Sequence, residues 1–187
     1  MIDFFKKLLD EIYSHDRIVL MTHSTPDLDG MASAIALSRI IGDLGKECYI
    51  VAPKNLINKT LNKALKCMSD EGIILPFKYE KSINTDSLLI ILDVREGRLT
   101  ECEKLVSLIK DKCIIDHHST GLTSINDVIC GYLDDSISST VQIICEYMKY
   151  LNMKVDALFN TALLAGLYQD TNYFNYKTTS KTFLIAS

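Results

Sequence analysis

The chain has 187 residues, which corresponds to one ordinary domain. Hydrophobic residues make up 48% of it and charged residues 24%, a globular composition that excludes a disordered or repetitive protein. The formal net charge of −4 argues against a large, sequence-independent nucleic-acid surface, since such a surface needs many Lys and Arg side chains. A short anionic substrate stays compatible with this charge, because a bound divalent ion supplies positive charge locally.

Strands and helices are predicted to alternate along the chain. A helix over 3–15 is followed by a strand over 18–21, a helix over 30–42, a strand over 48–51 and a helix over 55–68. The strongest strand comes next, over 87–92, and then a helix over 99–110, strands over 113–115 and 128–133, and helices over 138–151 and 155–168. This alternation is typical of an α/β fold with a mostly parallel β-sheet and helices on both faces.

Cysteine usage and hydropathy predict a cytoplasmic protein with no membrane partner. The six cysteines include no C-x-x-C pair, and most of them lie inside apolar runs, where Cys behaves as a small hydrophobic residue. The first residues show helical spacing and not the apolar run of a signal peptide. No segment approaches the roughly 18 uncharged apolar residues of a membrane span.

Three of the predicted strands end directly before polar residues that can bind metals. These residues are His23 after the first strand, Asp93 after the third, and the run Asp116, His117 and His118 after the fourth. The carboxyl ends of parallel strands meet at one edge of a sheet, so we expect these side chains to converge. A single Asp in such a position is more often a turn or capping residue, an interpretation that fits Asp134 and Asp135. The convergence of several such residues favours a site.

Asp27 and Asp29 lie in the predicted loop after the first strand. In an extended loop, residues i and i+2 point the same way, so both carboxylates reach adjacent ions. Several carboxylates share a small volume only when cations lie among them. Mixed imidazole and carboxylate ligands favour Mn²⁺, Zn²⁺ or Fe²⁺ over Ca²⁺. Two ions joined by a bridging carboxylate are a common arrangement for hydrolysing phosphate esters.

The order of these residues resembles the four motifs of the DHH phosphoesterase superfamily. The matching segments are His23 to Asp29 with Ser33 (H-x-x-P-D-x-D, then Ser), Asp93 with Arg98 and Leu99, the triplet Asp116-His117-His118, and residues 166–174 (G-x-x-x-D-T-G-x-F). Two positions depart from the pattern. Ala32 replaces the Gly before Ser33, and Asn172 replaces the Gly of the last motif, where Asn is the next most tolerant residue of left-handed backbone.

The resemblance implies a ligand set and a role for each of its members. The ligands are His23, Asp27, Asp29, Asp93, His117 and Asp170, the last of which is supplied by the resemblance alone. One ion would be held by His23, Asp27 and Asp93, and the other by Asp29, Asp93, His117 and Asp170. Asp93 would then bridge two divalent ions, for which Mn²⁺ is expected.

The resemblance also implies catalytic roles for two residues that are not ligands. His118 would contact the phosphoryl oxygens or assist proton transfer. Asp116 would orient its neighbours as a hydrogen-bond acceptor.

The nearest subgroup is the NrnA-type oligoribonucleases, which also dephosphorylate 3'-phosphoadenosine 5'-phosphate. Their second domain, DHHA1, carries a Gly-Gly-Gly-His motif that is not found here. We therefore expect residues 1–187 to be the DHH catalytic domain of a longer or truncated protein that acts on short RNA or nucleotides. A cyclic-dinucleotide phosphodiesterase, an inorganic pyrophosphatase and a RecJ-like exonuclease are alternatives. A non-catalytic module that binds metal and nucleotides is an alternative of another class.

Overall fold

The fold is a single six-stranded sheet, seen in a computed structural model that describes residues 1–119, 123–153 and 156–187. The strand order is β3-β2-β1-β4-β5-β6, and every described strand pair is parallel. The strands are β1 (Arg17–Met21), β2 (Glu47–Val51), β3 (Phe77–Lys78), β4 (Leu88–Leu92), β5 (Lys112–Asp116) and β6 (Val128–Leu133). The predicted α/β class is therefore confirmed.

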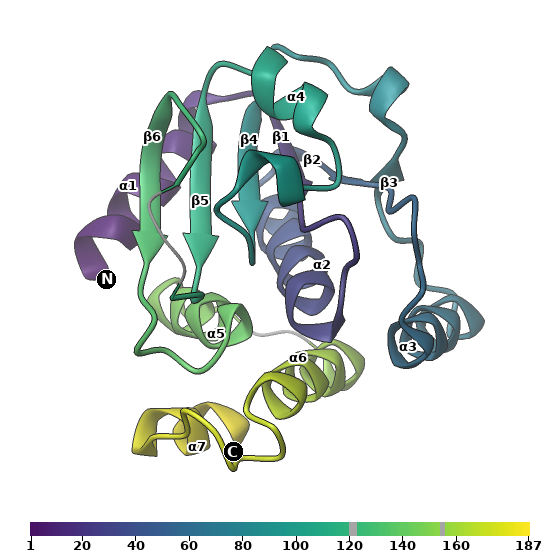
Figure 1. Cartoon of the computed structure of the whole chain (residues 1–187), viewed down its shortest axis with the longest axis vertical. Helices are drawn as coiled ribbons and strands as arrows, with labels where there is room; N and C mark the ends of the chain where they lie inside the picture. The colour runs from purple at the N-terminus through teal and green to yellow at the C-terminus, as the bar shows by residue number, and fades with distance from the viewer. Residues whose placement is uncertain (120–122, 154–155) are drawn as a thin grey trace.

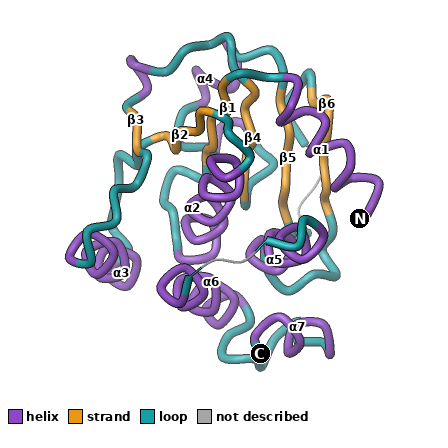
Figure 2. The backbone as a smooth tube through the Cα atoms, turned by 180° about the vertical axis from the view of Figure 1, so that it is seen from behind, coloured by secondary structure: helices purple, strands orange, loops and turns teal. Residues whose placement is uncertain are grey.

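Helices cover both faces of this sheet. They are α1 (Ile2–Ser14), α2 (Leu28–Asp43), α3 (Lys59–Asp70), α4 (Glu103–Leu108), α5 (Thr140–Tyr150), α6 (Ala157–Asp170) and α7 (Ser180–Ala186), with 3₁₀ turns η1 (Glu80–Ser82) and η2 (Gly97–Leu99). The two opposite views place α1 and α2 over one face and α4 over the other (Figures 1 and 2). Within the described ranges, no helix has both the length and the apolar character needed to cross a bilayer.

Alternate residues of the central strands enter two separate apolar cores. In β1, Ile18 and Leu20 belong to the core shared with α1, α2, α5 and α6, whereas Val19 and Met21 belong to the core shared with α4. All five residues of β4 are fully buried. Strands covered on both faces bury every residue, which explains why β1 and β4 read as unbroken apolar runs.

The strand order reverses at β1 and opens a crevice there. β2 and β3 extend from one side of β1, and β4, β5 and β6 from the other. Loops leaving the carboxyl ends of strands at such a reversal diverge and leave room for a ligand. Here, the loops after β1 and β4 are also joined, because Ser24 N donates to Leu99 O at 2.8 Å and Glu101 N donates to Thr22 O at 2.9 Å. Figure 1 shows β4, β5 and β6 directed towards α5 and α6.

The start of α2 differs from the prediction and changes the place of Asp29. The helix begins at Leu28 because Asp27 is its N-cap, whose carboxylate accepts a hydrogen bond from Gly30 N at 3.1 Å. Asp29 therefore lies in the first helical turn and not in an extended loop. Successive residues of a helix are rotated by about 100°, so the carboxylates of Asp27 and Asp29 diverge. The predicted loop geometry is wrong for Asp29.

Other boundaries shift for local reasons. The helix predicted over 99–110 is reduced to α4, because residues 99–101 pair with residues 22–24 instead. α3 begins later than predicted because Asn58 caps it, accepting hydrogen bonds from Thr60 N and Leu61 N. β3 has two residues, too few to show a period, and was not predicted. The predicted helix start at 155 lies outside the described residues.

The close packing of α6 against α2 gives a first prediction. A β-carbon at Gly166 would lie 2.9 Å from Val141 Cγ2, 3.0 Å from Leu28 O and 3.1 Å from Asp29 Cα. Two of these atoms are backbone, so Gly166→Ala must displace a helix. We expect it to lower the free energy of unfolding, measured in urea, by roughly 1–3 kcal/mol.

Gly42→Ala is the matched control for this substitution. Gly42 is also helical, and no described atom lies within 4 Å of the place that a β-carbon there would occupy. Alanine there should raise the free energy of unfolding by about 0.5–1 kcal/mol, because it restricts the unfolded chain. Equal effects of the two substitutions would contradict the tight contact at Gly166.

Candidate metal centre

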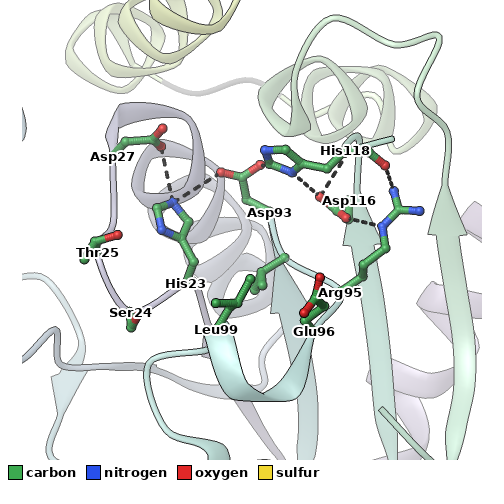
Figure 3. Close-up of a pocket in the computed structure, with 11 residues that line it drawn as sticks. His23, Ser24, Thr25, Asp27, Asp93, Arg95, Glu96, Leu99, Asp116 and His118 are labelled. Carbon is green, nitrogen blue, oxygen red and sulfur yellow. Dashed lines mark hydrogen bonds and ion pairs between the residues drawn. The ribbon is translucent and has the colours of Figure 1, made fainter. Parts of the chain in front are cut away.

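The first group of possible ligands surrounds the end of β1. His23 Nε2 lies 3.7 Å from Asp27 Oδ1 and 3.6 Å from Asp93 Oδ2. The imidazole comes from the loop after β1, the first carboxylate from the N-cap of α2, and the second from the residue after β4. These three side chains offer ligand atoms close enough together to hold one metal ion. Figure 3 shows them facing each other across the crevice.

The second group lies deeper, beside the end of β5. His117 Nε2 lies 2.9 Å from Asp170 Oδ2, 3.4 Å from Asp93 Oδ1 and 3.6 Å from Asp29 Oδ2. Asp29 comes from the first turn of α2, and Asp170 is the last residue of α6. Asp29, His117 and Asp170 also have ligand atoms spaced to hold an ion. All six predicted ligands are thus brought together, in two groups.

Asp93 stands between the groups, with one carboxylate oxygen towards each. Its backbone φ is 64°, in the left-handed region that few residues other than Gly occupy. Such strain persists where the surrounding structure fixes it. Here, Asp93 N donates to Ile115 O at 2.9 Å, and Thr140 Oγ1 donates to Asp93 Oδ1 at 3.0 Å. A β-carbon at Gly30 would lie 3.1 Å from Asp93 Oδ2, so that position leaves little space beside the carboxylate.

Asp29 is completely buried and serves as an anchor for α5. Its two carboxylate oxygens accept hydrogen bonds from Thr140 N and Val141 N, both at 2.8 Å. These N–H groups belong to the first turn of α5, where the helix dipole favours negative charge. Burial nevertheless raises the pKa of Asp29 well above its usual value, and the nearby charges of Asp93 and Asp170 raise it further.

His117 shows how strongly this cluster attracts positive charge. Burial works against its protonation, but the carboxylates of Asp170, Asp93 and Asp29 together raise its pKa to about 11. Both ring nitrogens are buried, and neither makes a hydrogen bond of good geometry with any described residue. A buried nitrogen without a hydrogen-bond partner, facing three carboxylates, suits a metal ligand. The donor set therefore fits divalent ions, whose binding displaces protons from such sites.

The remaining two predicted residues form a chain of contacts beside the ligands. Asp116 Oδ1 accepts a hydrogen bond from His118 Nδ1 at 2.7 Å, and Asp116 Oδ2 accepts one from Arg95 Nε at 2.6 Å. Burial alone would raise the pKa of Asp116, but these two donors lower it below its usual value. The pKa of His118 is raised, mainly by its hydrogen bond to Asp116.

The first group, His23, Asp27 and Asp93, lines a cleft of about 270 Å³. Arg95, Asp116 and His118 line it as well, together with Glu96, whereas Asp29, His117 and Asp170 of the second group are not among its lining residues. Figure 3 shows this arrangement, with His23 and His118 on either side of Asp93. The cleft lies at the strand-order reversal between β1 and β4, where an α/β sheet is expected to bind its ligand.

Comparison with known proteins now identifies the family. A family model described as the N-terminal domain of the DHH family matches residues 17–168. The chain belongs to the DHH family. The matched range includes His23, Asp93 and His117 and ends before Asp170.

Relatives of this DHH domain differ in what their names say they act on. It is 29% identical over 187 residues to the "Cyclic-di-AMP phosphodiesterase GdpP" of Bacillus subtilis, covering 96% of the chain and 28% of that protein. It is 28% identical over 188 residues to the "Probable bifunctional oligoribonuclease and PAP phosphatase NrnA" of Streptococcus mutans, covering 98% and 55%. The chain thus spans between about a quarter and about half of these relatives.

A solved structure shares the fold of the DHH domain. It is that of an exopolyphosphatase-related protein from Bacteroides fragilis, with a TM-score of 0.79 and 17% identity. The superposition covers 99% of this chain and 55% of the other. At this identity, the similarity concerns the fold.

Three residues of the DHH domain's site were not found from the sequence. Arg95, Thr140 and Gln169 contact Asp116, Asp93 and Asp27 respectively, the last through a hydrogen bond from Gln169 Nε2 at 3.1 Å. One signal was present for Thr140, because the run of hydroxyl residues 138–140 precedes a helix. Arg95 and Gln169 occupy positions that neither a run of hydroxyl residues nor the family motifs specify.

The hydroxyl of Thr140 gives a second prediction. Thr140→Val keeps the shape of the side chain but removes the donor to the buried Asp93 carboxylate. We expect the free energy of unfolding, measured in EDTA, to fall by roughly 1.5–3 kcal/mol, as for hydrogen bonds to charged groups. Thr140→Ser retains the hydroxyl and should lose clearly less. A Val variant as stable as the Ser variant would show that this hydrogen bond is dispensable.

Proposed function

We propose that this DHH domain is the catalytic part of a metal-dependent hydrolase that cleaves phosphate esters of short oligoribonucleotides or of 3'-phosphoadenosine 5'-phosphate. One observation carries the proposal. Asp93 places its two carboxylate oxygens between two His/Asp groups, 3.6 Å from His23 Nε2 and 3.4 Å from His117 Nε2. Two ligand groups that share a carboxylate suit a pair of ions, the arrangement that many phosphoesterases use.

The proposed ligands divide between the two groups. His23, Asp27 and Asp93 would hold one ion, and Asp29, Asp93, His117 and Asp170 the other. When bound, divalent ions polarise phosphoryl oxygens and make water a stronger nucleophile. The mixture of imidazole nitrogen and carboxylate oxygen suits Mn²⁺, Zn²⁺ or Fe²⁺, and of these Mn²⁺ is the resident ion that we propose. Asp29 accepts hydrogen bonds at both oxygens from α5, which holds it at a fixed place in the second group.

His118 is the proposed catalytic side chain. Its ring is half exposed and lines the cleft, and its Nδ1 is held by the buried Asp116 carboxylate. The second ring nitrogen is then available to donate a proton or a hydrogen bond to a phosphoryl oxygen. Asp116 acts through His118 by fixing its ring, which is the role of an orienting acceptor.

The small cleft and the acidic charge support a small substrate. A volume of about 270 Å³ lies near the lower end of the range for small-ligand sites. The net charge of −4 argues against an extended basic surface for a long nucleic acid. The NrnA relative supports the choice of short oligoribonucleotides and 3'-phosphoadenosine 5'-phosphate, since its name gives these two activities.

Hydrolysis of cyclic di-AMP is the second candidate function. The observation that favours it is the identity of 29% to the GdpP phosphodiesterase over nearly the whole chain. That identity is similar to the 28% shared with NrnA. Both candidates require the same ligands, so they differ only in the substrate bound in the cleft.

A substrate panel with Mn²⁺ tests the proposal. The panel contains pApA, longer oligoribonucleotides, 3'-phosphoadenosine 5'-phosphate, cyclic di-AMP and pyrophosphate, with product measured by chromatography. We expect turnover of pApA or 3'-phosphoadenosine 5'-phosphate. Preference for cyclic di-AMP would favour the second candidate, and preference for pyrophosphate would refute both. Stoichiometric Mn²⁺ binding without any turnover would favour a non-catalytic binding module.

The bridging carboxylate gives a third prediction. Asp93→Asn keeps the side-chain shape and tolerates the left-handed backbone, but removes the charge that both groups share. We expect loss of bound Mn²⁺, measured by mass spectrometry, and a fall in turnover of at least about 100-fold. Asp135→Asn, on an exposed turn, is the control and should change neither. Full Mn²⁺ content with retained turnover would refute the bridging role.

A further inference from the structure

We propose that Arg95 is a positioning residue that fixes the orientation of the His118 ring, and that turnover depends on it. The inference deepens the proposed function and rests on it. Arg95 lies outside the ligand groups, two residues after the bridging Asp93. Its guanidinium lines the same cleft as His118 (Figure 3).

The guanidinium of Arg95 binds both ends of the segment 116–118, which begins at the last residue of β5. Arg95 Nε donates to Asp116 Oδ2 at 2.6 Å, and Arg95 Nη2 donates to the backbone carbonyl of His118. Asp116 Oδ1 in turn accepts hydrogen bonds from His118 Nδ1 at 2.7 Å and from His118 N at 3.3 Å. Asp116 and His118 are therefore held by one rigid planar group. Both the backbone and the ring of His118 depend on its position.

The geometry requires an arginine. Asp116 is fully buried and the Arg95 side chain is 10% exposed, so this ion pair is removed from water. A buried carboxylate that loses its partner is left with an uncompensated charge. Lysine would supply a compensating positive charge, but it carries this charge on a single ammonium group. The guanidinium of arginine offers several hydrogen-bond donors in a fixed plane. One ammonium group does not reach Asp116 and the His118 carbonyl with the same directions.

Arg95 is itself held in place from the other side. Thr123 Oγ1 donates to Arg95 O at 2.8 Å, and Arg95 lies in the short connection between β4 and η2. The side chain of His118 is 50% exposed, and its ring also lies against the ring of His117, with 4.4 Å between the centroids. Among the described polar contacts of this ring, the 2.7 Å hydrogen bond to the Asp116 carboxylate is shorter than the 3.7 Å approach of Nδ1 to Asp93 Oδ1, so the carboxylate that Arg95 orients fixes where the second nitrogen of His118 points.

Arg95→Lys is the direct test, with Mn²⁺ and the substrate that the wild-type protein hydrolyses best. We expect kcat to fall roughly 10- to 100-fold, since small displacements of a reacting group have effects of this size. KM and bound Mn²⁺ should change little. Arg39→Lys is the matched control, because Arg39 Nε also pairs with a carboxylate, that of Asp43, on the exposed side of α2. Unchanged kcat in Arg95→Lys, or a fall that follows lost Mn²⁺, would overturn the proposal.

A double substitution separates positioning from general support of the fold. If Arg95 acts through His118, Arg95→Lys should lower kcat less than about twofold in the background of His118→Ala. A residue that only stabilises the domain would lower kcat equally in both backgrounds. Full additivity would therefore overturn the proposal.

A measurement on the wild-type protein needs neither turnover nor a folded variant. The ¹⁵N spectrum should show the Arg95 Nε–H as a shifted, slowly exchanging signal, in contrast to the exposed Arg39. A rapidly exchanging Arg95 Nε–H would overturn the proposed contact. Absent turnover in the substrate panel with a slowly exchanging Arg95 signal would refute the proposed function and leave the contact supported.

Discussion

Repulsion among four carboxylates is the constraint around which this DHH domain is built. Asp27, Asp29, Asp93 and Asp170 lie around two imidazoles, and burial and mutual repulsion raise the pKa of Asp29 and Asp93. The fold supplies partial compensation from neutral donors. The first turn of α5 donates two N–H groups to Asp29, and the hydroxyl of Thr140 donates to Asp93. These neutral donors compensate only part of the negative charge of the carboxylates. The remaining negative charge favours the binding of cations.

The same constraint explains the packing of elements that are distant in sequence. α6 carries Asp170 at its last residue and must reach the end of β5, so it lies directly against α2, and a glycine at the contact permits the approach. The strand-order reversal at β1 places the loops that carry His23 and Asp93 next to each other, and residues of both loops line the cleft. Sheet topology thus provides the space, and helix packing brings in Asp29 and Asp170, two proposed ligands that no strand end carries.

Sequence reasoning succeeded where position along a strand determines position in space. His23, Asp93 and His117 follow buried strands, so their convergence follows from parallel pairing. It failed for Asp29, because helix capping by Asp27 is decided by a single hydrogen bond. Asp170 was supplied by family resemblance. The hydrophobic periodicity of a helix predicts which face is buried, but it does not predict which residues the end of the helix contacts. The contacts of Arg95 and Thr140 depend on tertiary packing between distant segments, which a local pattern does not contain.

Asp93 destabilises the folded domain in two ways, through its left-handed backbone and through its buried charge. Its φ of 64° is strained for a side chain with a β-carbon, and its charge is buried among other carboxylates. Glycine at this position would relieve both, and selection for thermal stability alone would favour it. The domain therefore gives up some thermodynamic stability to keep the carboxylate, a trade-off characteristic of active sites.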